Sequence, residues 1–181
     1  MCIRDSYNTK AEKEIVKPLF EIDNSKNALR FKCTKKDEVI QMDVPFSYPT
    51  RLGIFSKELD QYIERTWSNK NFVLNLFRPE AGEATVEVRE INRNASYVLD
   101  NERNVVWLSS ALQQSERKRI LAHEFGHVLG FPDCYIQFFE KTTQNYVYYE
   151  FNESPNIMCS PRSDVVPENY FKEITEKLCS F

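Results

Sequence analysis

The stretch from His123 to Asp133, with the sequence HEFGHVLGFPD, constrains this chain more than any other. It closes a helix-like run that extends from Ser115 to Leu129. Because each residue of an α-helix advances by about 100°, His123 and His127 lie on one face, one turn apart. Two imidazoles at this spacing can hold one zinc ion, so the pattern predicts a metal-binding helix.

The residues around the histidine pair predict a site of the catalytic type. Glu124 follows His123, close enough to reach a water at the metal without being a ligand. Gly130 ends the helix, because glycine adopts the left-handed conformation at little steric cost, and Pro132 prevents the helix from resuming. Asp133 then returns with a carboxylate oxygen as the third ligand. A fourth position left open for water is typical of catalytic rather than structural zinc.

These residues resemble the long motif of the metzincin metallopeptidases, H-E-x-x-H-x-x-G-x-x-H, in a minority form that ends in Asp. The Asp-ended form is most similar to the snapalysin type of small secreted neutral protease. A second stretch, Asn156 to Ser160, resembles the Met-turn of that clan, the tight turn that places a methionine beneath the zinc. Some relatives carry a tyrosine two residues after this methionine. This chain has Ser160 there, so we assign no such tyrosine.

The resemblance implies a role for each residue of the motif. His123, His127 and Asp133 are expected to bind Zn²⁺, with Asp133 in place of the commoner third histidine. Glu124 is expected to be the general base of peptide-bond hydrolysis, and Met158 the hydrophobic floor of the site. The implied activity is that of a zinc metalloendopeptidase, because a site with two histidines and one carboxylate still supports peptide hydrolysis.

The resemblance also implies the fold class and the domain organisation. We expect an α+β, metzincin-like zincin with a mixed twisted sheet, two helices above the cleft and a small lower subdomain with a C-terminal helix. Residues 28–181 would form the catalytic domain, divided into an upper subdomain to about residue 130 and a lower one over 131–181. Residues 1–27 are interpreted as a flexible lead or the remnant of a pro-segment. Residues 1–6 lack a signal-peptide pattern, and we expect the natural amino terminus to be incomplete here.

Hydrophobic periodicity predicts the elements outside the motif. Strands are predicted at Ala28–Thr34, Glu38–Val44, Phe72–Phe77, Thr85–Ile91, Tyr97–Leu99 and Asn104–Leu108. A turn-rich connector is predicted at 45–49, and the region near 94–100 is expected to be an antiparallel edge strand that lines the cleft. Ser56 is the predicted N-cap of a helix that runs to about Ser68, and Asp164 that of a last helix.

The aromatic stretch from Ile136 to Phe151 has two interpretations. Its aromatic residues are Phe138, Phe139, Tyr146, Tyr148, Tyr149 and Phe151. One interpretation is a hairpin whose rings pack the lower subdomain. The other is that some of these rings wall a pocket for an apolar substrate side chain.

The cysteines leave several pairings open. The chain has five cysteines: Cys2, Cys33, Cys134, Cys159 and Cys179. A Cys134–Cys159 or a Cys134–Cys179 bridge is consistent with the expected site, and so are reduced, buried thiols. Cys33 as an inhibitory thiolate on the zinc is a further alternative, although the strand pattern explains its stretch by itself.

Charge and composition restrict the partners. A net charge of −3 over 181 residues does not indicate binding to nucleic acid, and no apolar run is long enough to span a membrane. We therefore expect a secreted or otherwise extracytoplasmic monomer that acts on protein or peptide substrates. The alternative function is a non-catalytic, zinc-stabilised peptide-binding module of the same fold. The intact Glu124 argues against that module, because a pure binder does not need this carboxylate.

Overall fold

The computed structural model describes most of the chain downstream of residue 30. The described residues are 22, 31–80, 83–99, 101–140, 144–150, 155–160, 162–179 and 181, with the backbone alone at 135–140 and 145–150. Of the predicted lead, 1–27, only Ile22 is described, and it is buried with 4% of its surface exposed.

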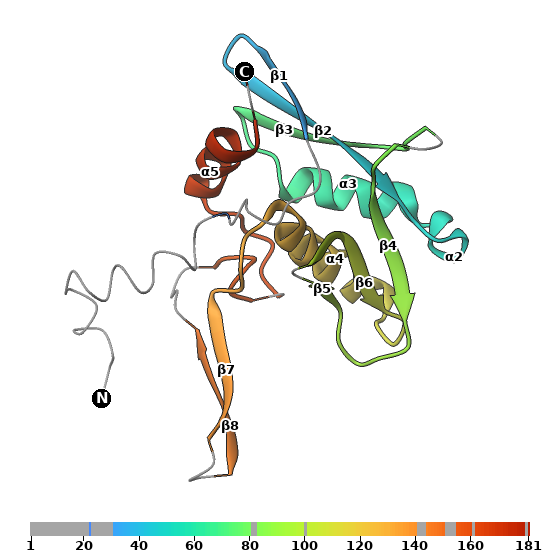
Figure 1. Cartoon of the computed structure of the whole chain (residues 1–181), viewed down its shortest axis with the longest axis vertical. Coiled ribbons are helices and arrows are strands. Elements are labelled where there is room, and N and C mark those ends of the chain that lie inside the picture. The colour runs from blue at the N-terminus through green and yellow to red at the C-terminus, as the bar shows by residue number, and fades with distance from the viewer. Residues whose placement is uncertain are drawn as a thin grey trace, which may run out of the picture.

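The described part of the chain contains helices and strands in mixed order (Figure 1). The strands are β1 (Lys32–Lys36), β2 (Val39–Ser47), β3 (Phe72–Phe77), β4 (Val86–Ile91), β5 (Tyr97–Leu99), β6 (Glu102–Ser109), β7 (Tyr135–Glu140) and β8 (Asn145–Glu150). The helices are α2 (Thr50–Gly53), α3 (Ser56–Thr66), α4 (Gln114–Leu129) and α5 (Glu168–Leu178). The predicted α+β class is confirmed.

Six strands form one mixed sheet. The order is β1-β2-β4-β6-β5, and β3 also pairs with β2. The β2–β3, β2–β4 and β4–β6 pairs are parallel, whereas β1 and β5 run antiparallel to their neighbours. The expected antiparallel edge strand near 94–100 is therefore β5, which pairs with β6 at one end of the strand order.

The core lies between this sheet and the helices α3 and α4. Met42, Val44 and Phe46 of β2 are fully buried, and the intervening side chains of the strand are not. They belong to one cluster with Ile63 of α3 and Phe125 of α4. The period of two along the strands and the period near 3.6 along the helices thus bring the apolar faces together.

Helix α4 begins one residue before its predicted start and ends where it was expected to end. Gln113 is the N-cap of a capping box, in which the Gln113 amide donates to Glu116 Oε2 at 3.0 Å. At the other end Gly130 has a φ of 100°, the left-handed conformation that only glycine adopts without strain. The chain can therefore reverse sharply behind the helix.

Two predicted boundaries differ from those in the structure. The strand predicted at Ala28–Thr34 is β1, which begins at Lys32, and residues 28–30 lie outside the described part. Within the predicted connector 45–49, the first three residues belong to β2. Pro45 lies where β2 passes from its last pair with β3 to its first pair with β4, so the missing amide proton disturbs the ladder least there.

Both predicted N-caps are also wrong. The N-cap of α3 is Phe55, because the short helix α2 already positions this residue through the Phe55 N–Leu52 O hydrogen bond of 2.9 Å. Pro167, rather than Asp164, precedes α5. The carbonyl of Val165 accepts a hydrogen bond of 2.8 Å from the amide of Ile157, which holds this strip extended against the preceding turn.

The four cysteines in the described part of the chain form two disulfides, Cys33–Cys179 and Cys134–Cys159. The Cys134–Cys159 alternative is confirmed, whereas the Cys134–Cys179 pairing and the reduced thiols are wrong. An inhibitory Cys33 thiolate is excluded in this structure, because its sulfur is bonded to Cys179 beyond the end of α5. Two such bonds are compatible with an extracytoplasmic protein.

Strands β7 and β8 form an antiparallel hairpin that extends away from the sheet (Figure 1). The backbone therefore agrees with the predicted hairpin. The aromatic side chains at 136–151 lie outside the described part, so both interpretations of their role remain predictions. None of the helices found in the described residues has the length and apolar content needed to traverse a bilayer.

The packing of α4 generates a stability prediction. A Cβ added at Gly126 would collide with Met158 Sδ and lie 2.9 Å from Trp67 Cζ2. We expect Gly126→Ala to lower the free energy of unfolding by about 1–3 kcal/mol through overpacking, measured by urea denaturation. Gly53→Ala is the matched control, because a Cβ there meets nothing within 4 Å. Equal denaturation midpoints for the two variants would contradict the close packing at Gly126.

Candidate metal centre

Helix α4 presents the two histidines side by side on one face. The imidazole rings of His123 and His127 are nearly perpendicular, at 89°, with their centroids 5.0 Å apart. His123 is 4% exposed, whereas the His127 side chain is 19% exposed. One ring is therefore held inside the protein, and the other lies closer to solvent.

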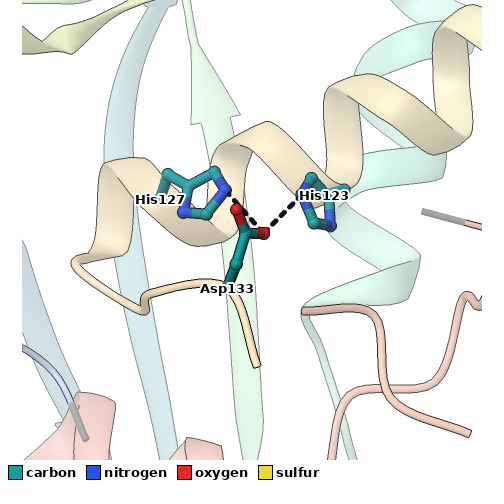
Figure 2. Close-up of side chains that lie close together, drawn as sticks. All are labelled: His123, His127 and Asp133. Carbon is teal, nitrogen blue, oxygen red and sulfur yellow. Dashed lines mark ion pairs between the residues drawn. The ribbon is translucent and has the colours of Figure 1, made fainter. Parts of the chain in front are cut away.

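Asp133 completes the group by reversing direction after α4. The amide of Phe131 donates to the carbonyl of Gly126 at 3.0 Å, which pins the reversal behind the helix. One carboxylate oxygen of Asp133, Oδ1, then lies 3.2 Å from Nε2 of His123 and 3.3 Å from Nε2 of His127. Figure 2 shows both rings and the carboxylate pointing at one another. The three predicted ligands are therefore brought together by the structure.

The other nitrogen of each ring is held by a backbone carbonyl. Nδ1 of His123 lies 2.7 Å from the oxygen of Ile157, and Nδ1 of His127 lies 2.8 Å from the oxygen of Phe131. Because a carbonyl oxygen only accepts hydrogen bonds, each Nδ1 carries a proton. In a neutral ring of this tautomer the lone pair of Nε2 faces Asp133, which is the arrangement that metal-binding histidines usually adopt.

The donor set fits a zinc ion. Two Nε2 lone pairs and one carboxylate oxygen converge, and the three ligand atoms lie within 4.8 Å of one another. Asp133 Oδ1 is buried and has no well-oriented hydrogen-bond partner among the described residues. Ligands about 2.0–2.1 Å from a tetrahedral zinc lie about 3.3 Å from each other, which matches both nitrogen–oxygen distances. A positive charge among them, from a metal cation or a shared proton, would offset the repulsion between the converging electron pairs.

The pKa shifts of His127 and Asp133 also indicate that a positive charge is favoured between these side chains. Burial lowers the pKa of the His127 imidazole, but the nearby carboxylate of Asp133 outweighs burial and raises it above its ordinary value. Burial raises the pKa of Asp133, but interactions with the two imidazoles outweigh burial and hold it well below its usual range. A shared proton or a metal cation satisfies the same demand, and two imidazoles with a carboxylate suit several divalent cations, zinc among them.

Glu124 lies next to the group without joining it. Its side chain is 5% exposed, and its Oε2 atom is buried without a hydrogen-bond partner among the described residues. Burial raises the pKa of Glu124, and nearby His127 and His123 act in the opposite direction. A buried carboxylate with a raised pKa and an unused oxygen is suited to accept and release a proton.

A turn lies beneath the histidine-bearing helix. Residues 157–159 form this turn, and Met158 within it is fully buried against Gly126 of α4. The turn is joined to the Asp133 loop in two ways: the amide of Cys134 donates to the carbonyl of Met158 at 3.1 Å, and the disulfide links Cys134 to Cys159. The methionine thus packs against the helix that carries the two histidines, and its role as a hydrophobic floor stays a prediction.

Sequence reasoning found the side chains that converge and missed the groups that orient them. The carbonyls of Phe131 and Ile157 were not predicted, because every residue carries a carbonyl and only the fold aims it. Asn156, which is 1% exposed, belongs to the predicted turn, and Tyr170, which is fully buried, belongs to the predicted last helix. No pattern in the sequence links either residue to a histidine.

Comparison of the chain with protein-family models, with curated proteins and with solved structures found no match. The case for the site therefore depends on its own residues and their geometry.

The geometry predicts which single change abolishes metal binding. Asp133→Ala removes the only carboxylate of the group and should lose zinc during dialysis, whereas Asp133→His restores a nitrogen ligand and should retain it. Zinc content per protein after exhaustive dialysis measures both. Unchanged zinc content in the alanine variant would refute the assignment of Asp133 as a ligand.

Proposed function

We propose that this protein is a zinc-dependent endopeptidase that hydrolyses peptide bonds in proteins. The observation that carries the proposal is the convergence of His123, His127 and Asp133 beside the buried carboxylate of Glu124. Partial exposure of the His127 and Asp133 side chains, 19% and 34%, leaves the group accessible from one side. A structural site would instead use a fourth protein ligand and be closed.

The residues divide the chemistry between them. His123, His127 and Asp133 would hold the zinc, and the carbonyls behind the two rings would keep the rings in place. Zinc held there would supply Lewis acidity, which lowers the pKa of a water and polarises a scissile carbonyl. Glu124 would accept the proton of the attacking water and pass it to the leaving amine. Its raised pKa suits both halves of this transfer.

The proposal includes the metzincin-type arrangement of the α+β fold. It is supported by the order of elements, in which α3, several parallel strands and an antiparallel strand precede the histidine-bearing helix. It is also supported by the turn with Met158 beneath that helix. An extended substrate would pair with the edge strand β5 through main-chain hydrogen bonds. Secretion of the protein is part of the proposal and is supported by the two disulfides.

A proteolysis assay separates the proposed activity from a peptide-binding module. Zinc-loaded protein is incubated with casein, with and without a chelator, and cleavage is followed by gel electrophoresis. We expect cleavage that the chelator abolishes and that added zinc restores. Tight peptide binding without turnover would instead support the non-catalytic module and overturn the peptidase proposal.

Replacement of Glu124 tests its assigned role. Glu124→Ala should retain zinc, because Glu124 is not a ligand, and should lose casein cleavage to the detection limit of the assay. Zinc content and cleavage rate are measured on the same sample. Glu38→Ala is the matched control, because Glu38 is an exposed carboxylate in the turn between β1 and β2. Equal cleavage by the Glu124 variant and the control would remove the general-base assignment.

A further inference from the structure

Tyr170 of helix α5 touches both segments that hold the histidine rings. It is fully buried, and it lies outside the group of three ligands. Its hydroxyl accepts a hydrogen bond of 3.1 Å from Nδ2 of Asn156. Its ring stacks on Phe131, with centroids 4.1 Å apart and an interplanar angle of 11°. One side chain from the last helix therefore connects the turn beneath α4 with the loop after it.

The hydroxyl of Tyr170 is connected to His123 through Asn156 and the turn that follows it. Asn156 Oδ1 accepts a hydrogen bond of 2.9 Å from the amide of Met158, which fixes the peptide units of the turn. Between these two residues lies Ile157, whose carbonyl accepts the 2.7 Å hydrogen bond from Nδ1 of His123. The orientation of that carbonyl thus depends on a buried amide that Tyr170 holds in place.

The ring of Tyr170 is connected to His127 through Phe131. Phe131 is 1% exposed, and its ring also stacks on Trp67, with centroids 5.9 Å apart. Its carbonyl accepts the 2.8 Å hydrogen bond from Nδ1 of His127. A shift of the Phe131 ring would carry its own backbone carbonyl with it, because the ring is anchored by stacking and the carbonyl belongs to the same residue.

We propose that Tyr170 is the positioning residue of the metal centre, aligning the ring of His123 through its hydroxyl and that of His127 through its ring. This inference rests on the zinc site of the proposed function and adds to it a residue of a remote helix. Orientation of metal-binding imidazoles by hydrogen bonds behind them controls metal affinity, and loss of such a partner typically weakens metal binding by about 10–100-fold.

The two contacts of Tyr170 are separable by mutation. Tyr170→Phe removes the hydroxyl and keeps a ring of the same shape, so it should disturb His123 and spare His127. Tyr170→Leu removes both contacts and should disturb both rings. Asn156→Ala acts on the same path as the hydroxyl and should again disturb His123 alone. A residue that merely filled the core would not divide its effects between the histidines in this way.

The chain has two histidines, which makes the test unusually direct. Zinc-saturated protein with ¹⁵N-labelled histidine gives one Nδ1–H signal for each ring. The chemical shift of each Nδ1–H signal and its rate of exchange with water report the hydrogen bond of that ring. This bond is made to the carbonyl of Ile157 by His123 and to the carbonyl of Phe131 by His127. We expect Tyr170→Phe to move the His123 signal and speed its exchange, while the His127 signal stays in place. Combining this change with Asn156→Ala should add nothing to Asn156→Ala alone, because both act through one path.

Tyr48→Phe is the matched control. Tyr48 donates a hydrogen bond of 3.0 Å from its hydroxyl to Asp60, so the substitution removes one tyrosine hydroxyl contact elsewhere in the fold. It should move neither ring signal. Zinc affinity, measured by competition with a chelator, should fall about tenfold in Asn156→Ala and stay unchanged in Tyr48→Phe.

Two outcomes would overturn the inference. In the first, both ring signals of the folded Tyr170→Phe protein stay as in the wild type. In the second, the His127 signal changes as much as the His123 signal. Should Tyr170→Leu fail to fold, the Tyr170→Phe and Asn156→Ala proteins decide the question. A protein whose ring signals respond as expected but which cleaves no casein would contradict the proposed peptidase function and leave the positioning role supported.

Discussion

Three electron-pair donors meet in this protein, and the surrounding structure is arranged to keep them together. Nε2 of His123 and Nε2 of His127 lie 3.2 and 3.3 Å from one oxygen of Asp133. Such an arrangement of electron pairs is repulsive unless a positive charge, from a metal cation or a proton, lies among them. The hydrogen bonds behind the two rings select the tautomer that makes this possible.

The third donor, Asp133, lies outside the helix that carries the two histidines. Gly130 permits the reversal through its φ of 100°, and the disulfide between Cys134 and Cys159 ties the residue after Asp133 to the residue after Met158. The loop that carries Asp133 and the turn beneath the helix are therefore one covalently linked unit. A domain of this size gains from such bonds, because they restrict the unfolded chain more than the folded one.

The sheet contributes to the centre indirectly. Its buried face packs on α3 and α4, and Trp67, immediately after α3, donates a hydrogen bond of 2.8 Å from Nε1 to the carbonyl of Ala122, beside His123. The same indole approaches Gly126, where an added Cβ would require Met158 or Trp67 to shift. The position of α4 is thus set from both sides, by the sheet and α3 on one and by the Met158 turn on the other. Rigid placement of this kind is what a catalytic constellation requires.

The sequence by itself determined the local features: the helix that carries His123 and His127, its end at Gly130, and the strands Phe72–Phe77 and Tyr97–Leu99. Each follows from side-chain period or from the backbone freedom of glycine, which act within a few residues. The tertiary structure alone decided the pairing of Cys33 with Cys179, the extension of β2 through Pro45, and the carbonyls of Phe131 and Ile157 that orient the rings. These depend on contacts between segments distant in sequence, whose directions only the packed chain sets.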